Sequence, residues 1–157
     1  MRNPLHQRLP VDPRTPALAR RLLRQWLESG NWPVNASDDL VLAVNEAITN
    51  AVEHAFPADR RGGGIELDAH AEAGDDRARR VVVTVTDDGH WRPPPGDAGF
   101  RGRGLDMIRA LVESLTVSPT ASGTRVTMTS DPSADSRSLT PDRNGSPHAH
   151  PSGAAGG

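Results

Sequence analysis

The residues best placed for chemistry form a row in the segment 40–56, LVLAVNEAITNAVEHAF. Glu46, Asn50 and His54 are four residues apart, so a helix would carry them on one side, opposite an apolar stripe. An asparagine carbonyl oxygen is a hard ligand that suits Mg²⁺, and a carboxylate one turn away could orient or deprotonate a hydroxyl. The row therefore fits a metal–nucleotide site, although a solvated helix face would show the same pattern.

Two further segments have the residue types of a nucleotide pocket. Asp87 ends the apolar run VVVTVTD, where its carboxylate could accept a hydrogen bond from an exocyclic amine such as that of adenine. Gly89 would let a ligand approach the backbone closely. Gly123 and Thr124 begin the last apolar run before the C-terminal segment. Taken singly, these segments also fit an ordinary turn and a hairpin.

Any phosphate bound by this chain must be held without lysine, because the 18 basic residues are all arginine. That absence excludes a P-loop, whose lysine contacts the phosphates, and also Schiff-base chemistry on lysine. Gly102, Arg103 and Gly104 open a predicted helix, and the free N–H groups at a helix N-terminus bind phosphate. The same glycines also fit a purely structural helix start.

Composition excludes several other classes of protein. The chain has no cysteine, so disulfides, thiolate catalysis and cysteine-based metal sites are excluded. A net charge of −2 argues against a general nucleic-acid binder, which needs a basic excess. The sequence shows neither an apolar run of membrane-spanning length nor a secretory signal. A cytoplasmic protein without direct contact to membrane or nucleic acid is expected.

The hydrophobic pattern predicts the elements that position these residues. Helical spacing predicts helices over residues 15–29, 36–56 and 105–115, the second with Ser37 as its N-cap. Alternation and β-branched residues predict strands over 65–70, 80–86, 115–118 and 124–129, with a loop over 87–102. The sum is a two-layer α+β sandwich, with a mostly antiparallel mixed sheet and the helices on one face.

The folded domain is expected over residues 1–130, followed by a disordered tail over 131–157. The tail is dominated by Pro, Ser, Gly and Ala, which cannot bury enough surface to offset the entropy of ordering. Its His148 and His150 are interpreted as incidental. In the first helix, Leu18, Leu22 and Trp26 are expected to pack on the sheet, although a partner surface stays open.

The order of the motifs resembles that of one family. A helix with E-x-x-x-N-A-x-x-H precedes a strand ending D-x-G, then G-x-G-L at a helix start, then G-T entering a strand. This arrangement is similar to the GHKL ATPase superfamily with its Bergerat fold, and within it to the anti-sigma factor serine/threonine kinase branch. The resemblance covers about residues 10–130. It departs from the family at Trp91, which replaces the second glycine of D-x-G-x-G.

The resemblance implies a role for each matching residue. Glu46 would be the general base or water-orienting carboxylate, and Asn50 would hold Mg²⁺. Asp87 would accept the adenine amino group. The nucleotide-binding residues implied in this way are Asn50, His54, Asp87, Gly89, Gly102, Arg103, Gly104, Leu105 and Thr124. The cofactors implied are ATP and Mg²⁺.

The function implied is that of an anti-sigma regulatory factor. Such a protein would phosphorylate a STAS-type anti-sigma-factor antagonist on Ser or Thr, would sequester a sigma factor, and would form a homodimer. Two alternatives stay open: a catalytically inactive ATP-binding partner-switch module, and an ATP hydrolase or a kinase domain acting on a separate histidine-bearing protein. An intact Glu46 favours catalysis, whereas Trp91 favours the inactive module.

Overall fold

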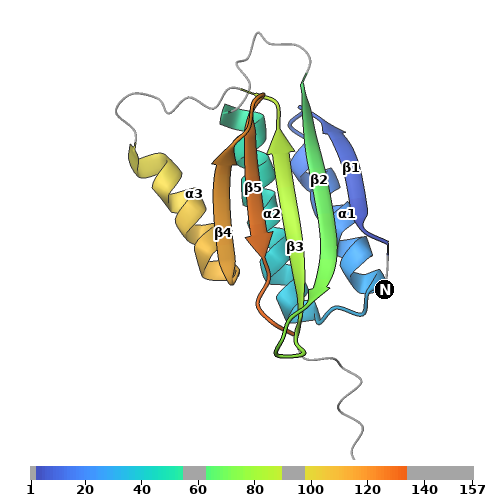
Figure 1. Ribbon diagram of the computed structural model, residues 1–157. Coiled ribbons are helices and arrows are strands. Elements are labelled where there is room, and N and C mark those ends of the chain that lie inside the picture. The colour runs from blue at the N-terminus through green and yellow to red at the C-terminus, as the bar shows by residue number, and fades with distance from the viewer. Residues whose placement is uncertain (1–2, 55–62, 90–97, 134–157) are drawn as a thin grey trace, which may run out of the picture.

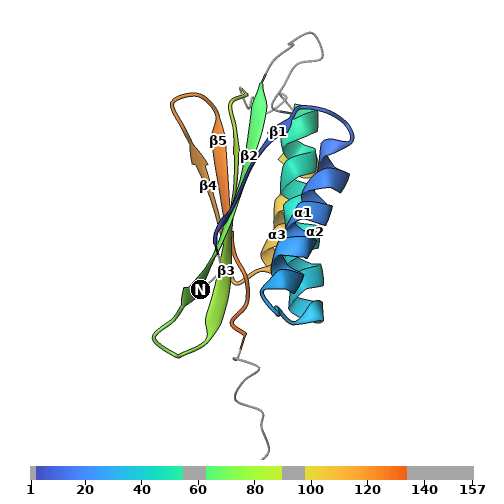
Figure 2. The same ribbon diagram turned by 90° about the vertical axis from the view of Figure 1, so that its right-hand side faces the viewer.

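The protein folds into two layers, a five-stranded sheet and three helices that cover one face of it (Figures 1 and 2). The computed structural model describes residues 3–54, 63–89 and 98–133. The strands are β1 (Leu5–Pro10), β2 (Gly64–Ala73), β3 (Arg79–Asp87), β4 (Ser114–Pro119) and β5 (Thr124–Thr129), and the helices are α1 (Thr15–Ser29), α2 (Val34–His54) and α3 (Ala98–Leu111). The strand order is β1-β2-β3-β5-β4. The expected two-layer α+β fold is confirmed.

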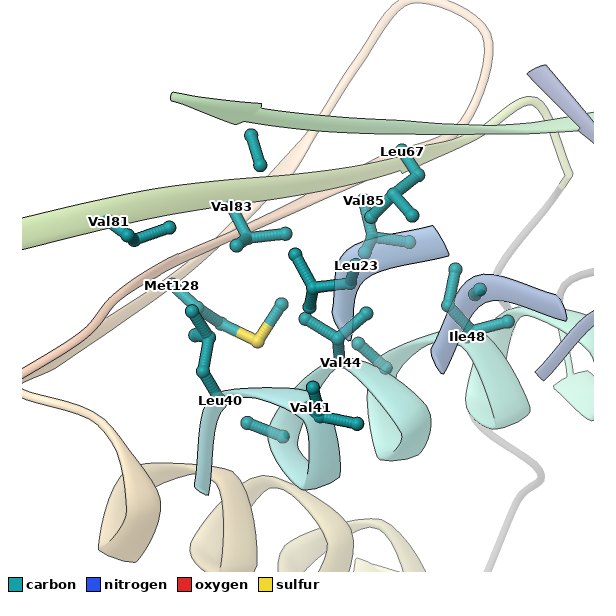
Figure 3. Close-up of a cluster of buried hydrophobic side chains, with 14 of the residues drawn as sticks. Leu23, Leu40, Val41, Val44, Ile48, Leu67, Val81, Val83, Val85 and Met128 are labelled. Atoms are coloured by element: carbon teal, nitrogen blue, oxygen red, sulfur yellow. The ribbon is translucent and has the colours of Figure 1, made fainter. Parts of the chain in front are cut away.

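The sheet is antiparallel at each of its four described pairings, so the expectation of a mixed sheet was wrong in that detail. An antiparallel sheet needs only one covered face, and the inward residues of its strands alternate with polar ones. Val81, Val83 and Val85 of β3 are at most 1% exposed. They meet Leu23 of α1 and Val44 of α2 between the two layers, as Figure 3 shows.

The first helix has the predicted bounds, and the second begins earlier than predicted. Ser37 is not the N-cap of α2, because the helix begins at Val34 and the Ser37 N–H already donates to the carbonyl of Pro33, four residues earlier, at 2.9 Å. Proline presets a helix-compatible φ and lacks an N–H, so it suits a helix start. The expected end at residue 56 lies outside the described residues.

Strand β1 was not predicted. It pairs with β2 from Leu5 opposite Ala69 to Pro10 opposite Gly64. Only Leu9 of this strand is buried, since an edge strand needs few apolar residues, and Pro10 ends it at the sheet edge. The strand matters for the site, because it lies along the start of β2.

Helix α3 begins and ends earlier in the chain than the helix predicted over residues 105–115, which it overlaps. It spans Ala98–Leu111, so the expected loop 87–102 is wrong in its last five residues. The helix stops because the chain then joins the sheet: Glu113 donates its N–H to the carbonyl of Thr129 at 2.9 Å, and Leu115 pairs with Met128 in β4.

Beyond β5, the described chain stays attached to the sheet up to Ser133, whose backbone exchanges hydrogen bonds with Arg79. These contacts reach three residues past the expected domain boundary at 130. The rest of the expected tail lies outside the described residues. Among the helices of the described ranges, none is long and apolar enough to span a membrane.

Candidate nucleotide site

The polar row on α2 lies at the edge of the core. Ala47, Ile48 and Ala51 are at most 4% exposed, and burying them turns Glu46 and Asn50 toward α3, where both side chains are half-buried. This helical row is therefore not a freely solvated face. His54 ends the described part of α2, and its side chain lies outside the described residues.

Helix α3 lies against this row at Gly104. A Cβ on Gly104 would lie 3.4 Å from Nδ2 of Asn50, 3.8 Å from its Oδ1 and 4.0 Å from Oε2 of Glu46. A longer side chain would occupy the space in front of the amide and the carboxylate. Glycine here leaves that space free, which agrees with a ligand-binding role for the row.

The expectation that Gly102, Arg103 and Gly104 open the helix is wrong. The helix begins four residues before Gly102, so these residues lie within it. Only the first four N–H groups of a helix lack an internal partner, and those belong to the turn that begins at Ala98. Free backbone amides for a phosphate would therefore come from the preceding turn, and the contribution of Gly104 is its close approach to Asn50.

Asp87 is the last residue of β3 and is only 5% exposed. Its Oδ1 accepts the N–H of Gly89 at 3.1 Å, and its carboxylate also accepts the N–H of Thr124. Burial nevertheless raises the pKa of Asp87 to about 6, and the negative charge of Asp88 adds to the increase. Within residues 3–54, 63–89 and 98–133, Asp87 forms no ion pair with a cationic side chain, and a buried carboxylate of this kind beside a pocket is typical of ligand sites.

Gly123 and Thr124 bring β5 against the end of β3. A Cβ on Gly123 would lie 1.9 Å from the carbonyl oxygen of Asp87, so no side chain fits at this position without a backbone shift. Thr124 pairs with Asp87 across the two strands and is 8% exposed. From the sequence, Gly123 and Thr124 were expected only as a hairpin turn or as a family motif. Their close contact with Asp87 explains why a glycine is needed at position 123.

One small pocket brings together four of the predicted site residues: Asn50, Asp87, Leu105 and Thr124. Glu46, Gly89 and Gly104 do not line it. It holds about 20 Å³, which is room for about one water molecule. Apart from Leu105, its apolar wall from α3, β4 and β5 was not predicted, because strand pairing and helix packing rather than local pattern bring these residues there. The lining residues are Ala47, Asn50, Ala51, Asp87, Leu105, Ile108, Val117, Thr124 and Val126.

The oxygen atoms of Glu46 and Asn50 suit Mg²⁺, which takes few protein ligands, better than a metal ion that needs all its ligands from the protein. Within the described ranges, no group of three or more His, Asp or Glu side chains could hold a metal ion. Mg²⁺ usually keeps several waters and takes only one or two protein oxygens together with phosphate oxygens. The Oδ1 of Asn50 fits that mode, with the carboxylate of Glu46 one turn away.

Comparison with known proteins points to one family. Residues 9–130 match the model of the histidine kinase-like ATPase domain. Blue-light-activated histidine kinase 2 of Erythrobacter litoralis is 36% identical over 84 residues, which are 53% of this chain and 23% of that protein. The match spans less than a quarter of that relative.

Solved structures agree with that match. The structure of the RsbU and RsbW domains of Rv1364c from Mycobacterium tuberculosis aligns with a TM-score of 0.59 and 29% identity, over 83% of this chain and 33% of that one. The histidine kinase domain of the Erythrobacter litoralis EL346 blue-light-activated histidine kinase aligns with a TM-score of 0.50 and 26% identity, over 77% and 60%.

Proposed function

This chain belongs to the histidine kinase-like ATPase domain family, and from that membership we propose that it is an ATP-dependent protein serine/threonine kinase. Its substrate would be a STAS-type anti-sigma-factor antagonist, and its regulatory target would be a sigma factor. Membership implies ATP binding, and the kinase relatives support phosphoryl transfer in general. The likeness to a structure containing an RsbW domain supports the choice of the anti-sigma branch.

The observation that carries the proposal is the shared pocket of Asn50, Asp87 and Thr124. Asn50 of α2 and the buried Asp87 of β3 line it from two different layers of the fold, beside small and aliphatic residues. This combination suits a flat, mostly apolar base that carries one exocyclic amine. The Asp87 carboxylate would accept the amine hydrogen, and Gly123 would keep β5 close to it.

The residues of α2 would act on the phosphate end of the nucleotide. Mg²⁺, bound by the Asn50 amide oxygen and by phosphate oxygens, would neutralise charge on the phosphates. Glu46 would orient the substrate hydroxyl and take its proton as the hydroxyl oxygen bonds to the γ-phosphorus and ADP leaves. One helical turn separates Glu46 from Asn50, which keeps base and metal within reach of the same phosphate.

Calorimetric titration of ATP with and without Mg²⁺ tests the nucleotide site. Asn50→Ala should lose the Mg²⁺-dependent part of the affinity and retain the rest. Asn45→Ala is the matched control: it removes the same residue type from the same helix, but its side chain accepts a hydrogen bond from Arg20 of α1. Failure of the wild-type protein to bind millimolar ATP would refute the nucleotide site.

Phosphorylation of a STAS-type antagonist, followed by mass spectrometry, tests the kinase activity. We expect one phosphate on Ser or Thr, and we expect the same preparation to be dimeric by light scattering. If the protein binds ATP but transfers no phosphate, the result would favour the partner-switch module, in which bound nucleotide controls only the affinity for a partner protein. Transfer to a histidine would place the chain with the sensor kinases that its relatives include.

A further inference from the structure

Asp88 lies beside the site but outside its pocket, and it joins three strands. Its Oδ1 accepts the N–H of Gly64, the first residue of β2, at 2.9 Å. Its Oδ2 lies 3.7 Å from Nη2 of Arg8 on β1. Arg8 in turn donates to Oε1 of Glu66 at 3.2 Å. Asp88, Gly64 and Arg8 form a clasp across one end of the sheet.

The clasp begins where the strand ladder ends. The pairing of β2 with β3 stops at Ile65 opposite Asp87, the last residue of β3, so the ladder gives Gly64 no partner on that side. The Asp88 carboxylate supplies an acceptor for the Gly64 N–H. A Cβ on Gly64 would lie 2.7 Å from Nη2 of Arg8, so the guanidinium covers the Gly64 backbone closely.

The clasp acts on the residue proposed to receive adenine. Asp88 stands between Asp87 and Gly89, and the Gly89 N–H returns to Oδ1 of Asp87 at 3.1 Å. Tying Asp88 to β2 and β1 therefore fixes the turn that aims the Asp87 carboxylate into the pocket. Without the tie, Asp87 would be held by the β3 ladder and by the hydrogen bonds that its carboxylate accepts from Gly89 and Thr124, and Asp88 would lose its described links to β1 and β2.

We propose that Asp88 is a positioning residue for the nucleotide site, which holds the Asp87–Gly89 turn through its hydrogen bond with Gly64 and, to a lesser degree, its exposed ion pair with Arg8. The role in ATP binding rests on the proposed function. The role in holding the turn does not, because it concerns contacts of the free protein.

Charge gives Asp88 a second effect on the site. The negative charge of Asp88 raises the pKa of Asp87 beyond what burial does alone. Among the described residues that line the pocket from α2, α3, β4 and β5, none besides Asp87 is titratable, so Asp88 is the neighbouring charge that matters. The hydrogen bond and the charge can be separated, because asparagine keeps the acceptor oxygen and removes the charge.

Three variants test the proposal. Asp88→Ala removes both the acceptor and the charge, Asp88→Asn removes only the charge, and Glu66→Gln removes the other acidic partner of Arg8 without touching the turn. ATP affinity should fall about tenfold in Asp88→Ala, the equivalent of about one lost hydrogen bond, and stay within about threefold in the other two variants. The Gly64 amide should lose protection from hydrogen exchange in Asp88→Ala alone.

A carbon-13 titration of the Asp87 carboxyl, without nucleotide, gives the readout that a merely structural residue would not move. Its midpoint should shift to lower pH in Asp88→Asn and stay unchanged in Glu66→Gln. If Asp88→Ala matches the wild type in affinity, in Gly64 exchange and in the midpoint, the proposal is wrong. If the wild type binds no ATP, the proposed function fails, while exchange and titration still decide whether Asp88 holds the turn.

Discussion

Replacing Asp87 by asparagine should make the protein more stable and less able to bind ATP. Asp87 is 5% exposed, and burial raises its pKa from 3.8 to about 6. At pH 7 the carboxylate is therefore ionised in a place that disfavours the charge. Asparagine has nearly the same shape and carries no charge, so the variant Asp87→Asn avoids this penalty.

The size of the effect follows from the two pKa values. The difference between 3.8 and about 6 corresponds to about 3 kcal/mol, at about 1.36 kcal/mol for each pH unit. Asparagine keeps one acceptor oxygen and turns an NH₂ toward the other N–H donor, which removes about 1 kcal/mol of hydrogen bonding. The net expectation is a gain of about 2 kcal/mol in the free energy of unfolding at pH 7.

The sign of the pH dependence is also fixed. The folded state binds the Asp87 proton more tightly than the unfolded state, so this residue stabilises the fold below pH 3.8 and the contribution disappears as pH rises through about 6. The advantage of Asp87→Asn should therefore shrink steadily from pH 7 toward pH 4. Asp12→Asn is the control of opposite sign, because Arg14 lowers the pKa of that carboxyl to about 2.

Urea unfolding at several pH values between 4 and 8, with ATP titrations on the same preparations, measures both effects. We expect a stabilised variant whose ATP affinity is at least about tenfold weaker. A variant that is less stable than the wild type at pH 7, or whose advantage does not depend on pH, would refute the reasoning. So would undiminished ATP affinity, because the carboxylate would then have no role in binding.

Other expectations concern the base, the tight turn and α3. Glu46→Gln should lower phosphoryl transfer at least about 100-fold with ATP affinity kept, whereas Asp39→Asn, an exposed carboxylate on the same helix, should change neither in the same assay. Gly123→Ala should cost about 1–3 kcal/mol or more in urea unfolding, because its Cβ would collide with backbone at 1.9 Å; Gly74→Ala, which meets only movable side-chain ends, is the control and should cost far less. Adenine is far larger than a pocket of about 20 Å³, so ATP should separate α3 from β5: methyl NOEs between Leu105 and Val126 should weaken on saturation, and unchanged NOEs would contradict this.

Much of the fold could be predicted because the core pattern is local. The alternation in β2 and β3 and the helical spacing in α1 record directly which face is buried. Strand β1 escaped prediction because only Leu9 of its residues enters the core. The start of α3 escaped because Gly99, Gly102 and Gly104 look like loop residues, since glycine is among the poorest helix formers.

The polar residues of the candidate site could be picked out from the sequence, but most of the apolar residues that line the pocket could not. Asn50 and Asp87 could be singled out by residue type and by their places on a helix face and at a strand end, and the family resemblance of the ordered motifs implied that they share a site. Ile108, Val117 and Val126 look like any core residue, and only the packing of α3 and the pairing of β4 with β5 bring them to the pocket. The role of each polar residue in binding ATP stays a prediction until the titrations above are made.

Several features that lower stability lie in one place, which favours a ligand-binding role for that place. A buried ionised Asp87, a helical Gly104 and the glycine contact at Gly123 each make the fold less stable or less tolerant than an ordinary alternative would. Apolar residues at the first two positions would serve the core better. These destabilising features lie around one pocket and are not spread over the chain. Such a cluster is typical of a ligand site, where binding of the ligand stabilises the fold and offsets the loss. Bound nucleotide should therefore raise the free energy of unfolding of the wild type far more than that of Asp87→Asn.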